Sequence, residues 1–227
     1  LKNPPVGKDL LRWKYQRYVK EYCRTIRSVD EQVGRLLDYL EEKGVLDNTV
    51  IVYTSDQGFL LGEHGLYDKR FMYEESFRTP LIISCPSLVK KHSVCKELVQ
   101  NIDLAPTFLS LAGVEVPKEM SGRSLLPLFK NGKAENWRNE LYYHFYDYPA
   151  VGSVRKHDGI RTKRYKLIHW YGEGSGNDEA IDFWELYDLK KDVMEVNNVY
   201  DNPKYVKVRE ALTVQLEKLR KDVGVTE

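Results

Sequence analysis

The longest regular pattern in the chain lies near its beginning, between Lys8 and Glu42. Apolar residues recur there at steps of three and four positions, which places them along one side of an α-helix. The apolar positions are Trp13, Tyr18, Tyr22, Ile26, Val29, Val33, Leu36, Leu37 and Leu40. The pattern predicts a long amphipathic helix with one buried stripe, which ends at Gly44 because glycine is a common helix terminator.

Two short runs of apolar residues predict strands, at 49–54 and at 80–84. Both runs are continuous rather than alternating, which is typical of strands buried on both faces in a parallel sheet between helical layers. A short helix is expected around 72–77 and a longer one over 101–111, where Pro106 suits the first turn. These elements predict an α/β fold with a largely parallel sheet.

The pattern changes beyond about residue 132, where Tyr, Trp and charged residues dominate. Runs at 140–146, 154–162, 165–171 and 184–186 alternate like half-exposed antiparallel strands. An amphipathic helix is predicted over 203–223. We therefore divide the chain into an α/β part, residues 1–131, and a smaller C-terminal α+β subdomain, residues 132–227, with an antiparallel sheet and a closing helix.

Composition narrows the classes of partner. The 227 residues are 42% hydrophobic, enough to bury a core, and 35 Lys and Arg against 34 Asp and Glu leave a net charge of +1. That balance gives no electrostatic reason to expect nucleic acid. No apolar run approaches the roughly 18 residues of a membrane span. Three cysteines without a CxxC motif exclude a disulfide scaffold. The chain begins at Leu1, and we expect a processed product or a part of a longer protein.

The first candidate site follows the first predicted strand, at Ser55-Asp56-Gln57-Gly58. In open α/β sheets, ligands bind beyond the carboxyl ends of strands. The Asp56 carboxylate and the Gln57 amide oxygen are hard ligands that suit Ca²⁺ or Mg²⁺, whereas zinc would favour His or Cys at one of the two positions. Taken alone, these residues are more often an Asx turn at a strand end.

The loop that follows carries a second group of polar residues. His64 stands between two glycines in Gly62-Glu63-His64-Gly65, and the cations Lys69 and Arg70 come shortly after it. On its own, His64 is more often a turn residue and Lys69 a solvated cation. Their occurrence together on a loop near a strand end favours a functional role.

The stretch from Asn48 to Ile83, which contains these motifs, closely resembles the second half of the type I sulfatases. These are formylglycine-dependent sulfate ester hydrolases of the alkaline phosphatase superfamily. The resemblance continues through 101–107, 111–113, 121–125, 159–162, 164–167 and 185–189, and so covers nearly the whole chain. It implies the C-terminal portion of an alkaline-phosphatase-like sandwich and its C-terminal subdomain.

The resemblance also implies roles for individual residues. It assigns Asp56 and Gln57 as two ligands of a single calcium ion and Lys69 as the lysine that contacts the sulfate oxygens. His64 is expected nearby, in the mouth of the active site. The chemistry is consistent, because a sulfuryl group in transfer carries charge on its non-bridging oxygens, which a divalent cation and a fixed ammonium stabilise.

The family's nucleophile motif, C-x-P-x-R or S-x-P-x-R, does not occur in this chain. Cys23-Arg-Thr-Ile-Arg27 has the outer spacing but lacks the proline, and the run after Cys85 lacks the arginine and a correctly placed proline. We therefore expect the formylglycine to belong to an N-terminal part that precedes these residues. The chain by itself should be inactive.

The substrate class rests on finer features of the resemblance. The run 68–75, the aromatic cluster at 142–148 and the segment 155–161 look most like carbohydrate sulfatases, in particular N-acetylglucosamine-6-sulfatases. A sulfated sugar or glycosaminoglycan would suit cations and aromatic faces. Arg155 and His157 are the predicted sugar contacts, although an aromatic cluster of this kind is more often part of a subdomain core.

Two other functions stay open from the sequence. A phosphatase or phosphodiesterase of the same superfamily would share the fold, with two zinc ions in place of one calcium. A non-catalytic module that binds sulfated glycans would keep Lys69 and the aromatic surface. The resemblance implies a periplasmic, extracellular or lysosomal location.

Overall fold

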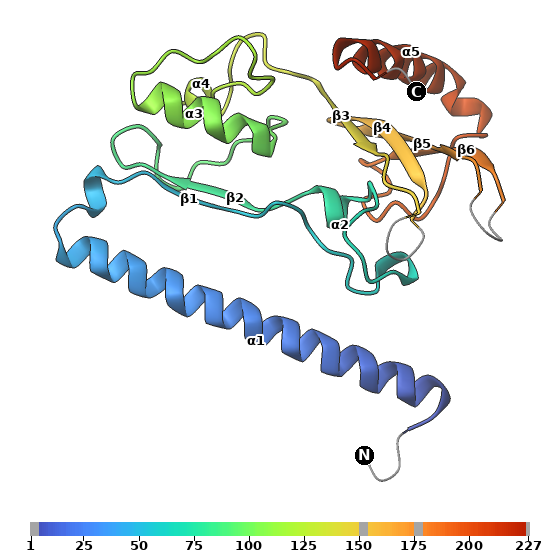
Figure 1. The fold of residues 1–227 in the computed structure, drawn as a ribbon, viewed down its shortest axis with the longest axis horizontal. Coiled ribbons are helices and arrows are strands. Elements are labelled where there is room, and N and C mark those ends of the chain that lie inside the picture. Colours follow the sequence, from blue (N-terminus) through green and yellow to red (C-terminus); the bar gives the residue numbers. More distant parts are fainter. Residues whose placement is uncertain (1–4, 150–153, 175–178, 226–227) are drawn as a thin grey trace.

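The structure is a computed structural model that describes residues 5–149, 154–174 and 179–225. The helices are α1 (Gly7–Glu42), α2 (Glu74–Phe77), α3 (Leu104–Leu111), α4 (Leu126–Phe129) and α5 (Val206–Asp222), with 3-10 turns at Leu46–Asn48, Glu63–Gly65, Asn101–Asp103 and Pro203–Tyr205. The strands are β1 (Ile51–Thr54), β2 (Leu81–Ser84), β3 (Glu140–Phe145), β4 (Lys156–Thr162), β5 (Tyr165–Gly172) and β6 (Ile181–Asp188) (Figure 1). In these ranges, no helix has the length and apolar character needed to cross a membrane.

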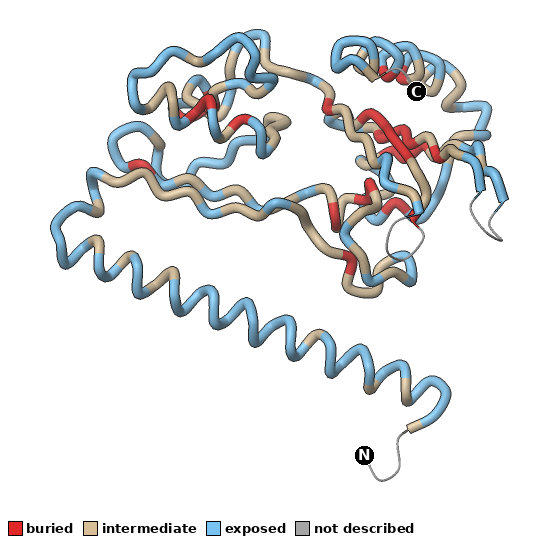
Figure 2. Tube along the Cα trace, viewed as in Figure 1, coloured by how far each residue is buried: buried red, intermediate tan, exposed pale blue. Residues whose placement is uncertain are grey.

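Helix α1 confirms the long helix predicted from the apolar periodicity. It ends as expected, because Gly44 adopts a φ of 66° and its N–H donates to the Glu41 carbonyl, while Val45 donates to Leu40. The predicted burial of its stripe is wrong in this structure, since no residue of α1 is buried and Ile26 is 50% exposed (Figure 2). Periodicity reveals that an apolar stripe exists, and the described residues supply no layer that covers it.

Strands β1 and β2 occur where the apolar runs predicted them, but they pair antiparallel, with Ile51 opposite Ser84 and Thr54 opposite Leu81. This corrects the expectation of a largely parallel sheet, because neither sheet in the described part of the chain contains a parallel pair. An apolar run carries no information on strand direction, and here the intervening loop doubles back. Burial on both faces is also wrong, since Ile82 is 62% exposed.

The C-terminal region forms the antiparallel sheet that the alternating runs predicted, in the order β3-β4-β5-β6. One face of this sheet packs against α5, which closes the chain as expected (Figure 1). The buried residues between them are Ile160, Leu167, Leu186, Leu212 and Leu216. Strand β6 is longer than its predicted segment at 184–186.

The opposite face of the same sheet is covered by the loop that follows β1. Leu60, Met72 and Tyr73 from this loop pack with Ile168, Trp170 and Tyr187 from the sheet. The approach is close at Gly159, where a Cβ atom would lie 2.7 Å from the Met72 sulfur. The loop that carries the candidate residues is therefore held against the C-terminal sheet.

Candidate catalytic site

The turn after β1 orients the Asp56 carboxylate. The Ser55 hydroxyl donates to the Gln57 carbonyl at 2.8 Å, and the Gln57 amide donates to Asp56 Oδ1 at 3.0 Å. That amide hydrogen bond is the main reason why the pKa of Asp56 lies below its usual value. Asp56 is exposed and negatively charged at neutral pH, as a metal ligand requires.

Asn101 fixes the backbone of this turn from a distant part of the chain. Its side-chain amide donates to the Ser55 carbonyl at 3.1 Å and to the Asp56 carbonyl at 2.9 Å. Asn101 begins the 3-10 turn that leads into α3. The turn is thus held both by its own hydrogen bonds and by the 3-10 turn that precedes α3.

Lys69 lies on the loop after β1, in a segment organised by Asp68. Asp68 Oδ1 accepts from the backbone amides of Lys69 at 2.6 Å and Arg70 at 2.8 Å, and its Oδ2 pairs with the Arg70 guanidinium at 2.6 Å. Among the residues that the structure describes, no acidic side chain lies within ion-pair distance of the exposed Lys69 amine. The loop therefore neutralises Arg70 and leaves the Lys69 ammonium available to an anion.

Ser76 of α2 connects the Lys69 loop to the Asp56 turn. Its hydroxyl donates to the Lys69 carbonyl at 3.1 Å and also to the Phe71 carbonyl. Its own carbonyl accepts from the Gly58 amide at 2.8 Å. A Cβ atom at Gly58 would lie only 2.0 Å from the Glu75 carbonyl, so glycine is required for this approach. The two loops thus meet at one short helix.

Asp56, Gln57 and Lys69 line the same groove, whose volume is about 1270 Å³. The groove runs past α2 and the start of β3 and reaches the turn that contains Asn101. The structure therefore brings together three of the residues singled out in the sequence, from two segments of the loop. A carboxylate, an amide oxygen and an ammonium around one space can hold a cation and an anionic ester side by side.

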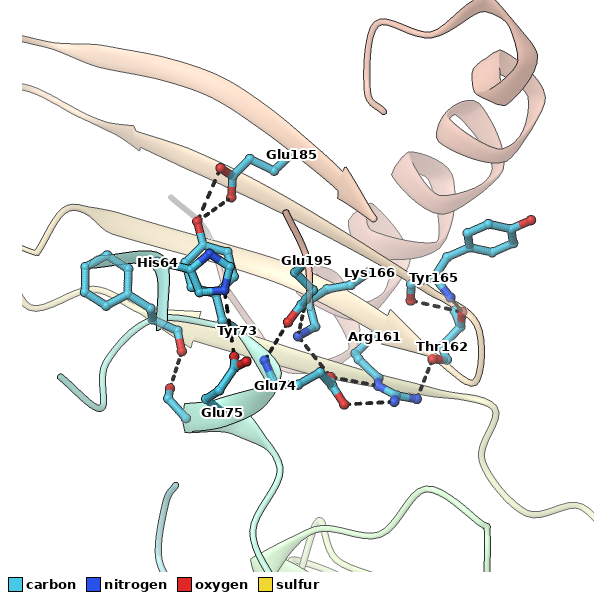
Figure 3. A network of polar contacts seen from close by, with 12 residues as sticks. His64, Tyr73, Glu74, Glu75, Arg161, Thr162, Tyr165, Lys166, Glu185 and Glu195 are labelled. Carbon is cyan, nitrogen blue, oxygen red and sulfur yellow. Dashed lines mark hydrogen bonds and ion pairs between the residues drawn. The ribbon is translucent and has the colours of Figure 1, made fainter. Parts of the chain in front are cut away.

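His64 lies outside the lining of this groove. Its ring stacks on Tyr73, with ring centroids 4.2 Å apart, and its Nε2 lies 3.8 Å from Glu75 Oε2. Figure 3 shows the two rings face to face, with the Tyr73 hydroxyl directed at Glu185, to which it donates at 3.2 Å. Burial and the charge of Glu185 raise the pKa of Tyr73, so the phenol stays a donor. The side chain of His64 is 16% exposed, and the residue does not line the groove.

The two predicted sugar contacts occupy different environments. His157 is fully buried, stacks on Trp170 at 4.2 Å between centroids and donates from Nδ1 to the Arg155 carbonyl at 2.8 Å. In this structure it has no surface through which to reach a sugar, and we leave it out of the proposed site. Arg155 donates to the Tyr148 hydroxyl at 3.0 Å, with its guanidinium 4.8 Å from the Tyr148 ring centroid.

The donor set at the strand end fits a hard cation such as calcium, because both groups bind through oxygen. It is partial, since calcium takes about six to eight oxygen ligands and this turn offers two side chains. Within the described ranges, no group of three or more His, Cys, Asp or Glu side chains could hold a metal ion. Asp56 and Gln57 would therefore serve as part of a larger ligand set.

Asn101 and Ser76 escaped assignment from the sequence. Both lie inside segments that carried the resemblance, but nothing in the local pattern gives either residue a role. Their contacts depend on packing, since Asn101 reaches a turn 45 positions earlier in the chain. For Asn101, the sequence shows only a polar side chain at the start of a predicted helix, a position where such side chains often bind backbone groups.

Comparison with protein families gives two matches. Residues 62–222 match the model of the N-sulphoglucosamine sulphohydrolase C-terminal region, and residues 3–114 match the sulfatase model. Together the two matches cover nearly the whole described chain, including the Asp56 turn, the Lys69 loop and the C-terminal sheet.

Individual proteins agree with the family models. The chain is 52% identical over 217 residues to an N-acetylglucosamine-6-O-sulfatase of Bacteroides thetaiotaomicron, covering 95% of this chain and 38% of the relative. It is 35% identical over 196 residues to a multifunctional alkaline phosphatase superfamily protein of Trinickia caryophylli, covering 81% of this chain and 36% of the relative.

A solved structure of a protein in complex with its substrate, D-glucosamine-2-N,6-O-disulfate, superimposes with a TM-score of 0.89 at 52% identity. The match covers 95% of this chain and 43% of that one. The chain thus spans about two fifths of the length of the proteins it matches.

Proposed function

This chain belongs to the sulfatase family of the alkaline phosphatase superfamily, and from that premise we propose that the complete protein hydrolyses sulfate esters of a carbohydrate. The observation that carries the proposal is the groove that Asp56, Gln57 and Lys69 line together. The substrate class follows from the similarity to the N-acetylglucosamine-6-O-sulfatase and to the protein solved with a sulfated glucosamine. A 6-O-sulfated glucosamine, free or at the end of a glycosaminoglycan, is the proposed substrate.

In this proposal, Asp56 and Gln57 supply two oxygen ligands of a calcium ion. The hydrogen bond from the Gln57 backbone amide lowers the pKa of Asp56 and so keeps its carboxylate ionised. The bound calcium would neutralise charge on the sulfate oxygens. Lys69 directs its ammonium at the same oxygens and binds the charge that grows during transfer of the sulfuryl group. The formylglycine of this family would come from the part of the protein that precedes these residues.

The amide at position 57 supports sulfate over phosphate. A two-zinc phosphatase site would favour an imidazole ligand, whereas an amide oxygen suits calcium. The similarity to a multifunctional alkaline phosphatase superfamily protein keeps a phosphatase or phosphodiesterase as the second candidate.

The test is turnover by the complete protein of matched esters, N-acetylglucosamine 6-sulfate and N-acetylglucosamine 6-phosphate, with either calcium or zinc supplied. The proposal expects sulfate release with calcium and a kcat/KM at least about a hundredfold above that for the phosphate, a difference of roughly 2.7 kcal/mol in barrier. Faster turnover of the phosphate with zinc would assign the protein to the second class. Binding of the sulfated sugar without turnover would assign it to a glycan-binding module.

A further inference from the structure

A buried carboxylate far along the chain contacts the start of α2. Glu195 follows β6 and is 1% exposed. Its Oε2 accepts from the Glu74 backbone amide at 2.6 Å, and its Oε1 lies 2.7 Å from the Lys166 ammonium, which is fully buried on β5. One oxygen of this carboxylate therefore accepts a backbone hydrogen bond, and the other forms an ion pair, as Figure 3 shows.

The contact extends into a chain of four ionisable side chains, Glu195, Lys166, Glu74 and Arg161. Lys166 also pairs with the Glu74 carboxylate at 2.9 Å, and Glu74 pairs with the Arg161 guanidinium of β4 at 3.1 Å. Burial alone would raise the pKa of Glu74, but the two cations outweigh it and keep that pKa below its usual value. Buried charges of this kind contribute little net stability compared with apolar residues of the same size, so their position calls for another explanation.

These side chains meet at the start of α2, the short helix that contacts both the Asp56 turn and the Lys69 segment of the loop after β1. Glu74 is the first residue of α2, and Ser76, two residues later, holds the Lys69 carbonyl with its hydroxyl and the Gly58 amide with its carbonyl. Tyr73, just before α2, is anchored to the same sheet through Glu185. The sheet thus fixes α2 at its start, and α2 fixes both loops.

We propose that Glu195 is a positioning residue for Lys69, acting through the Lys166 and Glu74 contacts that hold α2 in place. The inference rests on the proposed function, because Lys69 is the group that would meet the sulfate. A misplacement of a reacting group by about 1 Å can lower a rate by about a hundredfold. Contacts that hold α2 in place therefore help to maintain kcat. The C-terminal sheet then contributes to catalysis without touching substrate.

The first variant is Glu195→Gln in the complete protein. Glutamine has the same shape but a single acceptor oxygen, so it cannot face both the Lys166 ammonium and the Glu74 amide. The matched control is Asp188→Asn, the same chemical change at a carboxylate of β6 that is 2% exposed. Asp188 pairs with Arg164, at 2.9 and 2.8 Å, and neither of these two residues lines the groove.

The expected result is a split between kinetic constants. Glu195→Gln should lower kcat on N-acetylglucosamine 6-sulfate about tenfold or more, with KM within about threefold of the wild type. Asp188→Asn should lower the Tm about as much as Glu195→Gln does and leave kcat within about twofold of the wild type. Equal losses of kcat in both variants, or a Glu195→Gln protein that loses only Tm, would overturn the proposal.

A double-mutant cycle separates positioning from general loosening of the fold. In a Lys69→Ala background, Glu195→Gln should lower kcat by clearly less than it does in the wild type, because the main group that it positions is already gone. Additive losses of kcat in the double variant would show that Glu195 acts elsewhere.

If Glu195→Gln fails to fold, Ser76→Ala tests the same path with a smaller change. It removes the hydroxyl bond to the Lys69 carbonyl and should show the same loss of kcat and the same non-additivity with Lys69→Ala. Full activity in a folded Ser76→Ala protein would contradict the inference. A wild-type protein that releases no sulfate would refute the proposed function instead.

Discussion

Lys69 and Arg70 are adjacent cations that the loop treats differently. Arg70 is paired with Asp68 at 2.6 Å, whereas the Lys69 amine is exposed on the groove. In the complete protein, Lys69→Ala should lower kcat/KM for the sulfated sugar by about a hundredfold or more, since one preorganised charge donor is worth about 2.7 to 4 kcal/mol of barrier. Steady-state kinetics measure this, with the exposed loop residue Lys91→Ala as the control. Nearly wild-type kinetics in Lys69→Ala would make Lys69 an ordinary surface lysine.

His157 gives a prediction for pH. Burial lowers its pKa from 6.5 to about 4, so the unfolded chain takes up a proton that the folded chain refuses. Stability therefore falls as pH drops from 6.5 to 4, by at most about 3 kcal/mol for this residue. Thermal melts across this range should show a shallower loss of Tm in His157→Gln than in the wild type. Parallel curves would show that His157 does not titrate in this way.

The candidate site residues in a recognisable motif could be predicted from the sequence. The motif singles out Asp56, Gln57 and Lys69, and the structure places all three on one groove. Glu195 could not be found in this way, because its contact with Glu74 spans 121 positions. Residues that position others have no chemical signature of their own, and only the packed fold reveals them.

At the scale of elements, the periodicity of apolar residues predicted the type of each helix and strand better than it predicted how the strands pair. The helices near both ends and the four antiparallel C-terminal strands form where their patterns placed them. The direction of β2 relative to β1 was wrong, because a run of apolar residues such as Leu81–Ser84 reads the same in a parallel and an antiparallel pair. Direction is set by the returning loop, whose path depends on packing against the C-terminal sheet.

The contact between α2 and the Asp56 turn can be tested at Gly58. Gly58→Ala would place a Cβ atom 2.0 Å from the Glu75 carbonyl, which forces α2 away from the strand end. We expect a loss of Tm together with a fall in kcat/KM of about tenfold or more. Gly34→Ala in α1 is the control, since its Cβ would meet nothing within 4 Å, and alanine should stabilise the helix by up to about 1 kcal/mol. Wild-type kinetics in Gly58→Ala would show that α2 and the turn move independently.

At the scale of the whole molecule, α1 exposes most of its apolar stripe, in which Tyr18 packs on Tyr67. The exposed fraction is 50% at Ile26, 44% at Val29 and 57% at Leu36. The four-residue strands β1 and β2 form a sheet of their own, with Ile82 open to solvent. Contiguous apolar surface and free strand edges of this kind favour association.

The 227 residues expressed alone should therefore aggregate or fold only in part. Light scattering after size exclusion and a thermal melt measure this, and Leu36→Glu should reduce the association of the isolated chain by placing a charge in the stripe. The part around the C-terminal sheet should keep its secondary structure, because its own core is buried. A soluble monomer with one sharp cooperative melt would contradict the expectation and would favour a self-sufficient glycan-binding module.

The central claim is that Asp56, with Gln57 and Lys69, forms a calcium-dependent sulfate ester site in the complete protein. The most direct measurement is of calcium content together with sulfate release from N-acetylglucosamine 6-sulfate, for the Asp56→Ala and Asp47→Ala variants. Asp47 is the control, because it is exposed and lies in the turn that precedes β1, whereas Asp56 follows this strand. The account predicts that Asp56→Ala loses both bound calcium and turnover with little change in Tm, while Asp47→Ala keeps both. Stoichiometric calcium and full sulfate release in Asp56→Ala would contradict the account.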